Sequence, residues 1–144
     1  MPSPRIVPHS DGAGEIDAVG VGVDASRLGE RVWCFGAQSY RPFGTAAQYV
    51  TVPAWQAVRL PDGVPFEQSA CLGISGITAH RALFVDGSIQ GKTVLIAGAT
   101  GAVGSVATQL AAWSGALVIA TVRELVSAEE RGCWVRHMLS ILLL

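Results

Sequence analysis

The sequence predicts an α/β protein in which short antiparallel strands precede one strand–turn–helix–strand (βαβ) unit. Two observations indicate the βαβ unit: residues 93–97 form an uninterrupted apolar or β-branched run, and three glycines spaced three apart follow it. A third observation concerns the first part of the chain, where short strand-like runs are separated by Gly and Pro. Such punctuation is typical of a small antiparallel barrel or sandwich.

The βαβ unit follows from apolar spacing. Residues 93–97 lack the alternation of a half-exposed strand, so they predict a strand buried on both faces. Apolar side chains then recur with helical spacing over residues 102–114, and Gly115 suits the left-handed position that ends a helix. Residues 117–121 predict a second buried strand, which completes a unit with the size of a βαβ crossover.

The turn between strand and helix has the glycine spacing of a dinucleotide-binding motif. One glycine permits a tight reversal, another lets the backbone approach a pyrophosphate, and the third lets the helix pack closely. Free amides at the start of the helix then attract the phosphate charge. The residues predicted to bind the cofactor here are Gly98, Ala99, Thr100, Gly101, Ala102, Val103 and Gly104. The alternative is that these glycines serve only a tight turn. A P-loop is excluded, because no Lys-Ser or Lys-Thr pair follows the last glycine.

Composition argues against several partners. The 144-residue chain is 50% hydrophobic with net charge −1, which disfavours nucleic acid or an anionic membrane surface. Cys34, Cys71 and Cys133 stand far apart and form no CxxC pair, so we expect a reducing, cytoplasmic compartment and no cysteine zinc site. We expect no signal peptide at the proline-rich start, and the apolar run at residues 138–144 is too short to span a bilayer.

The same signals predict the remaining elements. We expect strands near residues 15–19, 28–35, 44–52 and 57–60. Residues 66–72 and 77–84 are predicted to be helical, with an interruption at residues 73–76, where two glycines stand. After Arg123 the pattern fails, because charged residues mix with Gly132 and Trp134 before a leucine-rich end.

Motifs in five segments occur in an order that is specific to one superfamily. They are Pro-His-Ser-Asp-Gly-Ala-Gly-Glu at 8–15, Leu-Gly-Glu-Arg-Val-Trp at 28–33, Gly-Thr-Ala-Ala-Gln-Tyr-Val at 44–50, the segment 70–80 and the glycine turn at 98–104. With them the chain resembles the medium-chain dehydrogenase/reductase superfamily, within it the quinone reductase (zeta-crystallin-like) branch. The resemblance implies a partial chaperonin-10-like (alcohol dehydrogenase-like) catalytic domain at residues 1–62, a partial Rossmann cofactor-binding domain at 63–123 and a divergent tail at 124–144.

The resemblance also implies the chemistry. A nicotinamide cofactor gives a hydride to a small quinone or enone, and the protein supplies orientation and electrostatics. Thr78 matches the helix position behind the nicotinamide, where it orients the ring; the alternative is a threonine that caps its own helix. Tyr49 is expected in the barrel core, and no proton donor is assigned, so the catalytic residues stay unknown.

The resemblance bears on metal as well. Zinc-dependent relatives carry a His-Glu pair before the Gly-x-Gly and a cysteine near the first Rossmann helix. Ser10 stands at the histidine position and Ser75 at about the cysteine position, and hydroxyls are poor zinc ligands. The short loop at residues 36–44 leaves no room for a four-cysteine lobe. We therefore expect no metal, and we interpret His9 as a solvated loop residue.

The end of the second strand of the βαβ unit bears on cofactor choice. Proteins that prefer NAD place an acidic residue there for the ribose 2′-hydroxyl. Here Val122 is followed by Arg123, whose forked donors can bind a 2′-phosphate. Glu124 is the counter-argument, and a solvated surface arginine is the alternative. These residues favour NADPH.

Two departures from the family pattern predict a fragment. The family has further strands before residue 6 and after residue 121, so we expect a chain truncated at both ends, with impaired activity. The second strand of the βαβ unit should then keep an unpaired outer edge. One alternative is a non-enzymatic remnant or interaction fragment, and another is an atypical short-chain reductase. The oligomeric state is left open, a homo-oligomer included.

Overall fold

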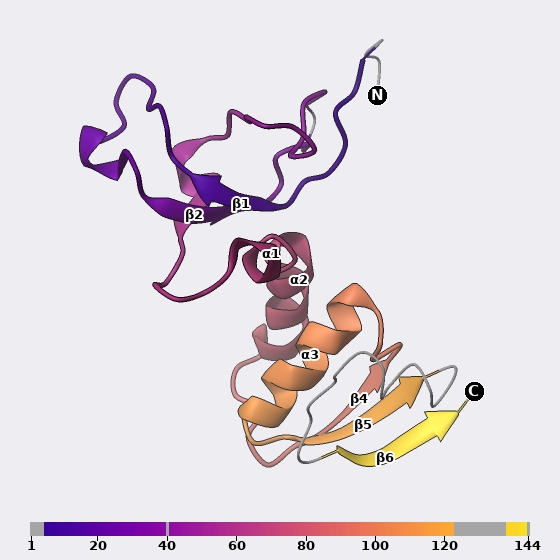
Figure 1. Cartoon of the computed structure of the whole chain (residues 1–144). Helices are drawn as coiled ribbons and strands as arrows, with labels where there is room; N and C mark the ends of the chain where they lie inside the picture. The colour runs from indigo at the N-terminus through magenta and orange to yellow at the C-terminus, as the bar shows by residue number, and fades with distance from the viewer. Residues whose placement is uncertain (1–4, 40, 123–137, 144) are drawn as a thin grey trace. The chain divides into compact units, whose positions relative to one another are not determined.

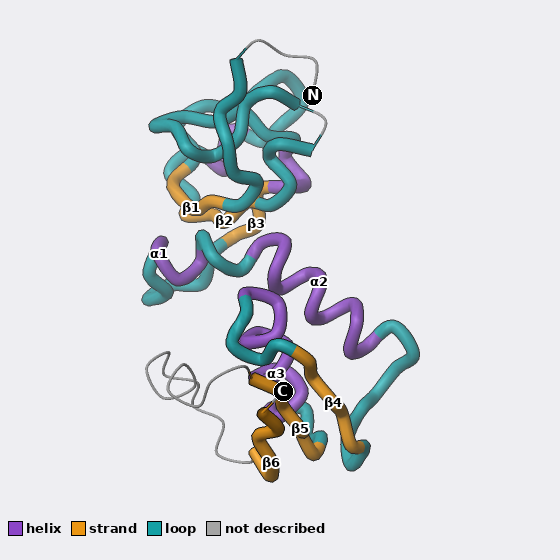
Figure 2. The backbone as a smooth tube through the Cα atoms, turned by 90° about the vertical axis from the view of Figure 1, so that its right-hand side faces the viewer, coloured by secondary structure: helices purple, strands orange, loops and turns teal. Residues whose placement is uncertain are grey.

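The computed structural model describes residues 5–39, 41–122 and 138–143, and the chain forms two compact units (Figure 1). The first unit, Met1–Ile74, holds the antiparallel strands, and the second, Ser75–Leu144, holds the βαβ unit. Within the described residues the strands form two three-stranded sheets, one in each unit (Figure 2).

The first unit is built on a three-stranded antiparallel sheet. Strand β2 (Arg31–Cys34) lies between β1 (Gly12–Glu15) and β3 (Ala57–Arg59). Val32 and Cys34 are buried while Arg31 and Trp33 are half-buried, as the alternation of a strand requires. Two short 3-10 helices, η1 (Ala25–Arg27) and η2 (Ala54–Gln56), precede β2 and β3.

Two of the strand predictions for this unit were wrong. The first strand covers residues 12–15 instead of 15–19, because its register pairs Gly12 with Cys34 and Glu15 with Arg31. Residues 44–52 are all described and form no strand. The amides of residues 44–46 instead donate to carbonyls of residues 7–9, so the segment pairs with the incoming chain and does not extend the sheet.

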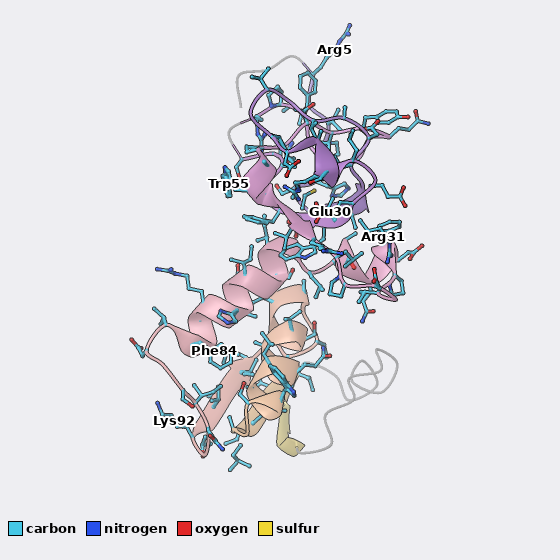
Figure 3. The ribbon with its side chains drawn as sticks, turned by 90° about the vertical axis from the view of Figure 1, so that its left-hand side faces the viewer. Arg5, Glu30, Arg31, Trp55, Phe84 and Lys92 are labelled. Atoms are coloured by element: carbon cyan, nitrogen blue, oxygen red, sulfur yellow. The ribbon has the colours of Figure 1, made fainter. Side chains whose placement is uncertain are left out.

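Arg31 ties the chain that leaves β3 back to the sheet (Figure 3). Its guanidinium donates to the carbonyl of Val64 at 2.7 Å and lies 4.5 Å from the ring centre of Phe66. Phe66 begins α1 (Phe66–Ser69), a single helical turn. One arginine therefore anchors both the linker and the start of α1 by a hydrogen bond and a cation–π contact.

Helix α2 (Gly73–Phe84) starts earlier than predicted. The two glycines of residues 73–76 predicted an interruption, but the helix is continuous through them. The reason lies far away in the sequence: Asp11 Oδ2 accepts a hydrogen bond from the amide of Ile74 at 2.7 Å. A carboxylate at a helix N-terminus satisfies a free amide and complements the helix dipole, which overrides the weak propensity of glycine.

The second unit contains the predicted βαβ arrangement. Strand β4 (Thr93–Ala97), helix α3 (Ala102–Trp113) and strand β5 (Leu117–Val122) agree with the predicted ranges to within one residue. β4 and β5 pair in parallel, with Thr93 opposite Leu117 and Ala97 opposite Thr121. Gly115 has a φ of 78°, so the predicted left-handed stop after the helix is confirmed.

The outer edge of β5 is paired, against the prediction. Strand β6 (Met138–Leu143) joins it in parallel, from Val118 opposite Met138 to Val122 opposite Leu143, with one register shift. The leucine-rich run beyond residue 137 therefore supplies a third strand. Five of its six residues, all but Ser140, are apolar, which is compatible with a strand in a parallel sheet.

The core of the second unit lies between α3 and one face of the sheet, which α3 crosses in Figure 1. Ile96, Val118 and Ala120 of the strands meet Ala107 and Ala111 of the helix. The prediction that β4 is buried on both faces was wrong, because Thr93, Leu95 and Ala97 are exposed. Within the part of the chain that the structure describes, only one face of this strand is covered.

Candidate functional site

The glycine turn follows β4 without a break. Gly98 has a φ of 67°, a conformation that residues with a Cβ rarely adopt. The amide of Gly101 donates to the carbonyl of Gly98 at 2.9 Å and closes the turn. Gly101 is then the N-cap of α3, so the turn leads the chain directly from the end of the strand into the helix.

Gly104 lets the first turn of α3 lie against the glycine turn. A Cβ on residue 104 would stand 2.2 Å from the carbonyl oxygen of Gly98 and 2.8 Å from its carbon. Both are backbone atoms, so no side chain can move aside to make room. The close helix packing expected of the third glycine is therefore present.

The N-terminus of α3 is suited to an anion. No side chain among the described residues caps it, and its first turn contains no acidic residue. The amides of Ala102, Val103 and Gly104 have no acceptor four residues back within the helix, because the helix begins here. Together with the helix dipole, these amides form the positive end at which phosphates bind in proteins.

Two amides of the turn are engaged within the protein. The amide of Gly98 donates to Thr121 Oγ1 at 3.2 Å, and the amide of Ala99 donates to the carbonyl of Thr121 at 3.1 Å. Gly98 and Ala99 therefore shape the turn and are not free donors. Sequence reasoning missed Thr121; its only signal was a hydroxyl residue near the end of the second strand.

Comparison with known proteins shows the family to which the chain belongs. Residues 1–62 match the alcohol dehydrogenase GroES-like domain. Rat quinone oxidoreductase is 41% identical over 123 residues, which are 83% of this chain and 36% of that protein. The human synaptic vesicle membrane protein VAT-1 homolog is 37% identical over 111 residues, 76% of this chain and 27% of that one. The structure of Escherichia coli quinone oxidoreductase complexed with NADPH superposes with a TM-score of 0.76 at 26% identity, over 99% of this chain and 42% of the other.

The chain belongs to the quinone reductase branch of the medium-chain dehydrogenase/reductase superfamily. It spans 36% of the length of the rat relative and 27% of the human one. The GroES-like match and the two sheets confirm the predicted fold class, a chaperonin-10-like antiparallel part followed by a Rossmann βαβ part. They argue against an atypical short-chain reductase, whose glycine fingerprint stands at the very start of its chain.

Of the other predicted site residues, the structure describes Val122 and Thr78. Val122 is the last residue of β5 and is 5% exposed, packed in the core. Arg123 lies outside the described residues. Thr78 is exposed in the interior of α2, well beyond its first residue, so it does not stand at the cap of its helix. Its orienting role stays a prediction.

The described residues offer no metal cluster, and the thiol of Cys34 is buried. Among them, no three His, Cys, Asp or Glu side chains gather where they could hold a metal ion. His9 is exposed, with a φ of 73°. Burial raises the pKa of the Cys34 thiol and the charge of Asp11 raises that pKa further, so the thiol stays protonated and is a poor nucleophile.

None of the helices in the described residues combines the length and the apolar character needed to cross a bilayer. Tyr49, which was expected in a barrel core, is 76% exposed, so that prediction was wrong. The strand that would have buried this side chain does not form at residues 44–52.

Proposed function

We propose that the chain binds NADPH at the N-terminus of α3 and belongs to a zinc-independent enzyme that reduces a quinone or another conjugated carbonyl. The observation that carries the proposal is the uncapped helix start beside the glycine turn. The Escherichia coli relative, a quinone oxidoreductase complexed with NADPH, supports the choice of cofactor. A cytoplasmic location, expected from the spacing of the cysteines, is part of the proposal.

Each residue has a defined part in this proposal. The amides of Ala102, Val103 and Gly104 bind the diphosphate, while Gly98 and Gly101 shape the turn. The absence of a Cβ at residue 104 keeps these amides close to the turn. Thr78 orients the nicotinamide ring and Arg123 binds the 2′-phosphate. NADPH itself supplies the hydride when it is bound.

A non-enzymatic role is the second candidate, and the exposed apolar surface favours it. Leu95 is 66% exposed on the open face of the second sheet, and Leu117 of the neighbouring strand is 38% exposed on the same face. Surfaces of this kind suit contact with another polypeptide. As this second candidate we propose an interaction role, in which the 144-residue chain contacts another polypeptide and reduces quinones slowly or not at all.

Replacing Ala102 by proline tests the phosphate site. Ala102 is the first residue of α3, where proline fits a helix, and Gly101 before it is extended, as proline requires. The substitution removes one amide donor and leaves the helix intact. We expect the affinity for NADPH, followed by fluorescence titration, to fall about tenfold or more, because the lost bond is to a charged group.

Ala25→Pro is the matched control. Ala25 is the first residue of η1 in the first unit, and Asp24 before it is also extended. This variant should bind NADPH like the unmodified chain. No measurable NADPH binding by the unmodified chain, or equal binding by Ala102→Pro, would overturn the proposed site.

A further inference from the structure

Thr121 joins the end of β5 to the glycine turn by two hydrogen bonds of different kinds. Its carbonyl accepts from the amide of Ala99, a bond that any residue at this register position can make. Its hydroxyl oxygen accepts from the amide of Gly98, a bond that needs the Oγ of threonine or serine. The second bond is therefore a specific property of this side chain.

The hydroxyl bond acts on the most flexible point of the turn. Gly98 and Gly101 lack side chains, and glycine has more backbone freedom to lose than any other residue. Gly98 must hold a φ of 67° for its carbonyl to accept from Gly101 and to lie against Gly104. A fixed acceptor for the Gly98 amide restricts this freedom before any ligand arrives.

The hydrogen bonds of the turn also indicate how Thr121 would affect the binding of a diphosphate. The amides of Gly98, Ala99 and Gly101 all have acceptors inside the protein. In the proposed function the phosphate donors are the amides of the first turn of α3, which directly follows this turn. Thr121 acts on them through the turn and not by touching the phosphate.

We propose that Thr121 is a positioning residue for diphosphate binding, because its hydroxyl holds Gly98 in the conformation that presents the start of α3. The inference rests on the proposed function, since it concerns the same site. It predicts a loss of affinity for any ligand that carries the diphosphate, with little change in fold stability.

Three variants separate the hydroxyl from the shape of the side chain. Thr121→Val keeps the β-branched form that suits a strand but removes the acceptor, and Thr121→Ser keeps the acceptor. Thr93→Val removes a hydroxyl from the exposed start of β4, away from the turn, and is the control. Thermal unfolding of all three should stay close to that of the unmodified chain.

The binding arm uses NADPH and ADP-ribose, which share the diphosphate. Thr121→Val should weaken both by about threefold to tenfold, the worth of one neutral hydrogen bond. Thr121→Ser and Thr93→Val should bind both ligands like the unmodified chain. Unchanged binding by Thr121→Val, a loss confined to NADPH, or an equal loss in Thr121→Ser would overturn the proposal.

Amide hydrogen exchange, read by NMR without any ligand, tests the bond itself. The Gly98 amide should be protected in the unmodified chain and in Thr121→Ser, and should exchange faster in Thr121→Val. Equal exchange in all variants would overturn the positioning role. If the unmodified chain binds neither NADPH nor ADP-ribose, the proposed function fails, and the exchange of Gly98 still decides whether Thr121 holds the turn.

Discussion

In nucleotide-binding βαβ units, residues at the end of the second strand often determine whether NAD or NADP is preferred. Val122 and Arg123 occupy these positions in the sequence. Val122 is buried in the core, so its side chain offers nothing to a ribose. Val122 matters because it is not acidic: an acidic residue in this place would repel a 2′-phosphate. The next residue, Arg123, is the nearest cation in the sequence that could attract that phosphate.

Replacing Arg123 by alanine tests this preference. The unmodified chain should bind NADPH about tenfold more tightly than NADH, the effect of a charge-assisted bond to phosphate worth roughly 1–2 kcal/mol. Arg123→Ala should remove most of the difference, measured by fluorescence titration with both nucleotides. Arg59→Ala, at an exposed arginine of β3, is the control and should keep the preference. Equal or better NADH affinity of the unmodified chain would contradict the prediction.

At the scale of elements, the start of α2 depends on one residue of another segment. Asp11 lies just before β1, and its carboxylate accepts from the amide of Ile74 at 2.7 Å. Gly73 has no Cβ, and one built there would lie 2.3 Å from Asp11 Oδ1. The pair therefore needs both residue types, a short acid and a residue without a side chain. Both residues lie in the first unit.

Substitutions of Asp11 should weaken the fold in proportion to what they remove. Asp11→Asn keeps an acceptor but loses the charge at the helix N-terminus, and should cost about 0.5–1 kcal/mol of unfolding free energy. Asp11→Ala loses both and should cost about 1–2 kcal/mol. Chemical denaturation measures both values, beside Asp62→Ala in an exposed loop. A cost for Asp11→Ala no larger than that of the control would show that the cap contributes nothing.

At the scale of the whole molecule, apolar surface remains open in each unit. Leu95 and Leu117 are 66% and 38% exposed in the second unit, and Phe43 and Trp55 are 61% and 69% exposed in the first. Exposed apolar area forfeits about 25 cal/mol per Å² of stabilisation. Pairing with β6 gives hydrogen-bond partners to the outer edge of β5, which the sequence analysis predicted to be unpaired.

A steady-state assay with NADPH and a small quinone tests activity at this scale. The chain as given should turn over little or no quinone. A chimera in which residues 5–122 replace the matching segment of rat quinone oxidoreductase should be active, because the remainder of that enzyme can hold the quinone within hydride range. Equal turnover by the two would show that the chain needs no further segment. An inactive chimera that still binds NADPH would count against the proposed reaction.

The sequence by itself determined the βαβ unit and the family. The apolar run of β4, the glycines at 98, 101 and 104, and the stop at Gly115 are local patterns, so each could be recognised without its neighbours in space. The seven predicted turn residues follow from the same patterns, although their binding of a cofactor stays a prediction.

Only the tertiary structure decided where α2 begins, what pairs with β5 and which atom holds Gly98. Asp11 reaches Ile74 over 63 positions, and Thr121 reaches Gly98 over 23. Strand β6 begins at Met138, 16 positions after the last residue of β5, and still pairs with that strand. Contacts between residues so far apart in the sequence depend on the tertiary fold. The spacing of residues along the chain does not predict them. For the same reason, glycines that favour a break in isolation were incorporated into a continuous helix.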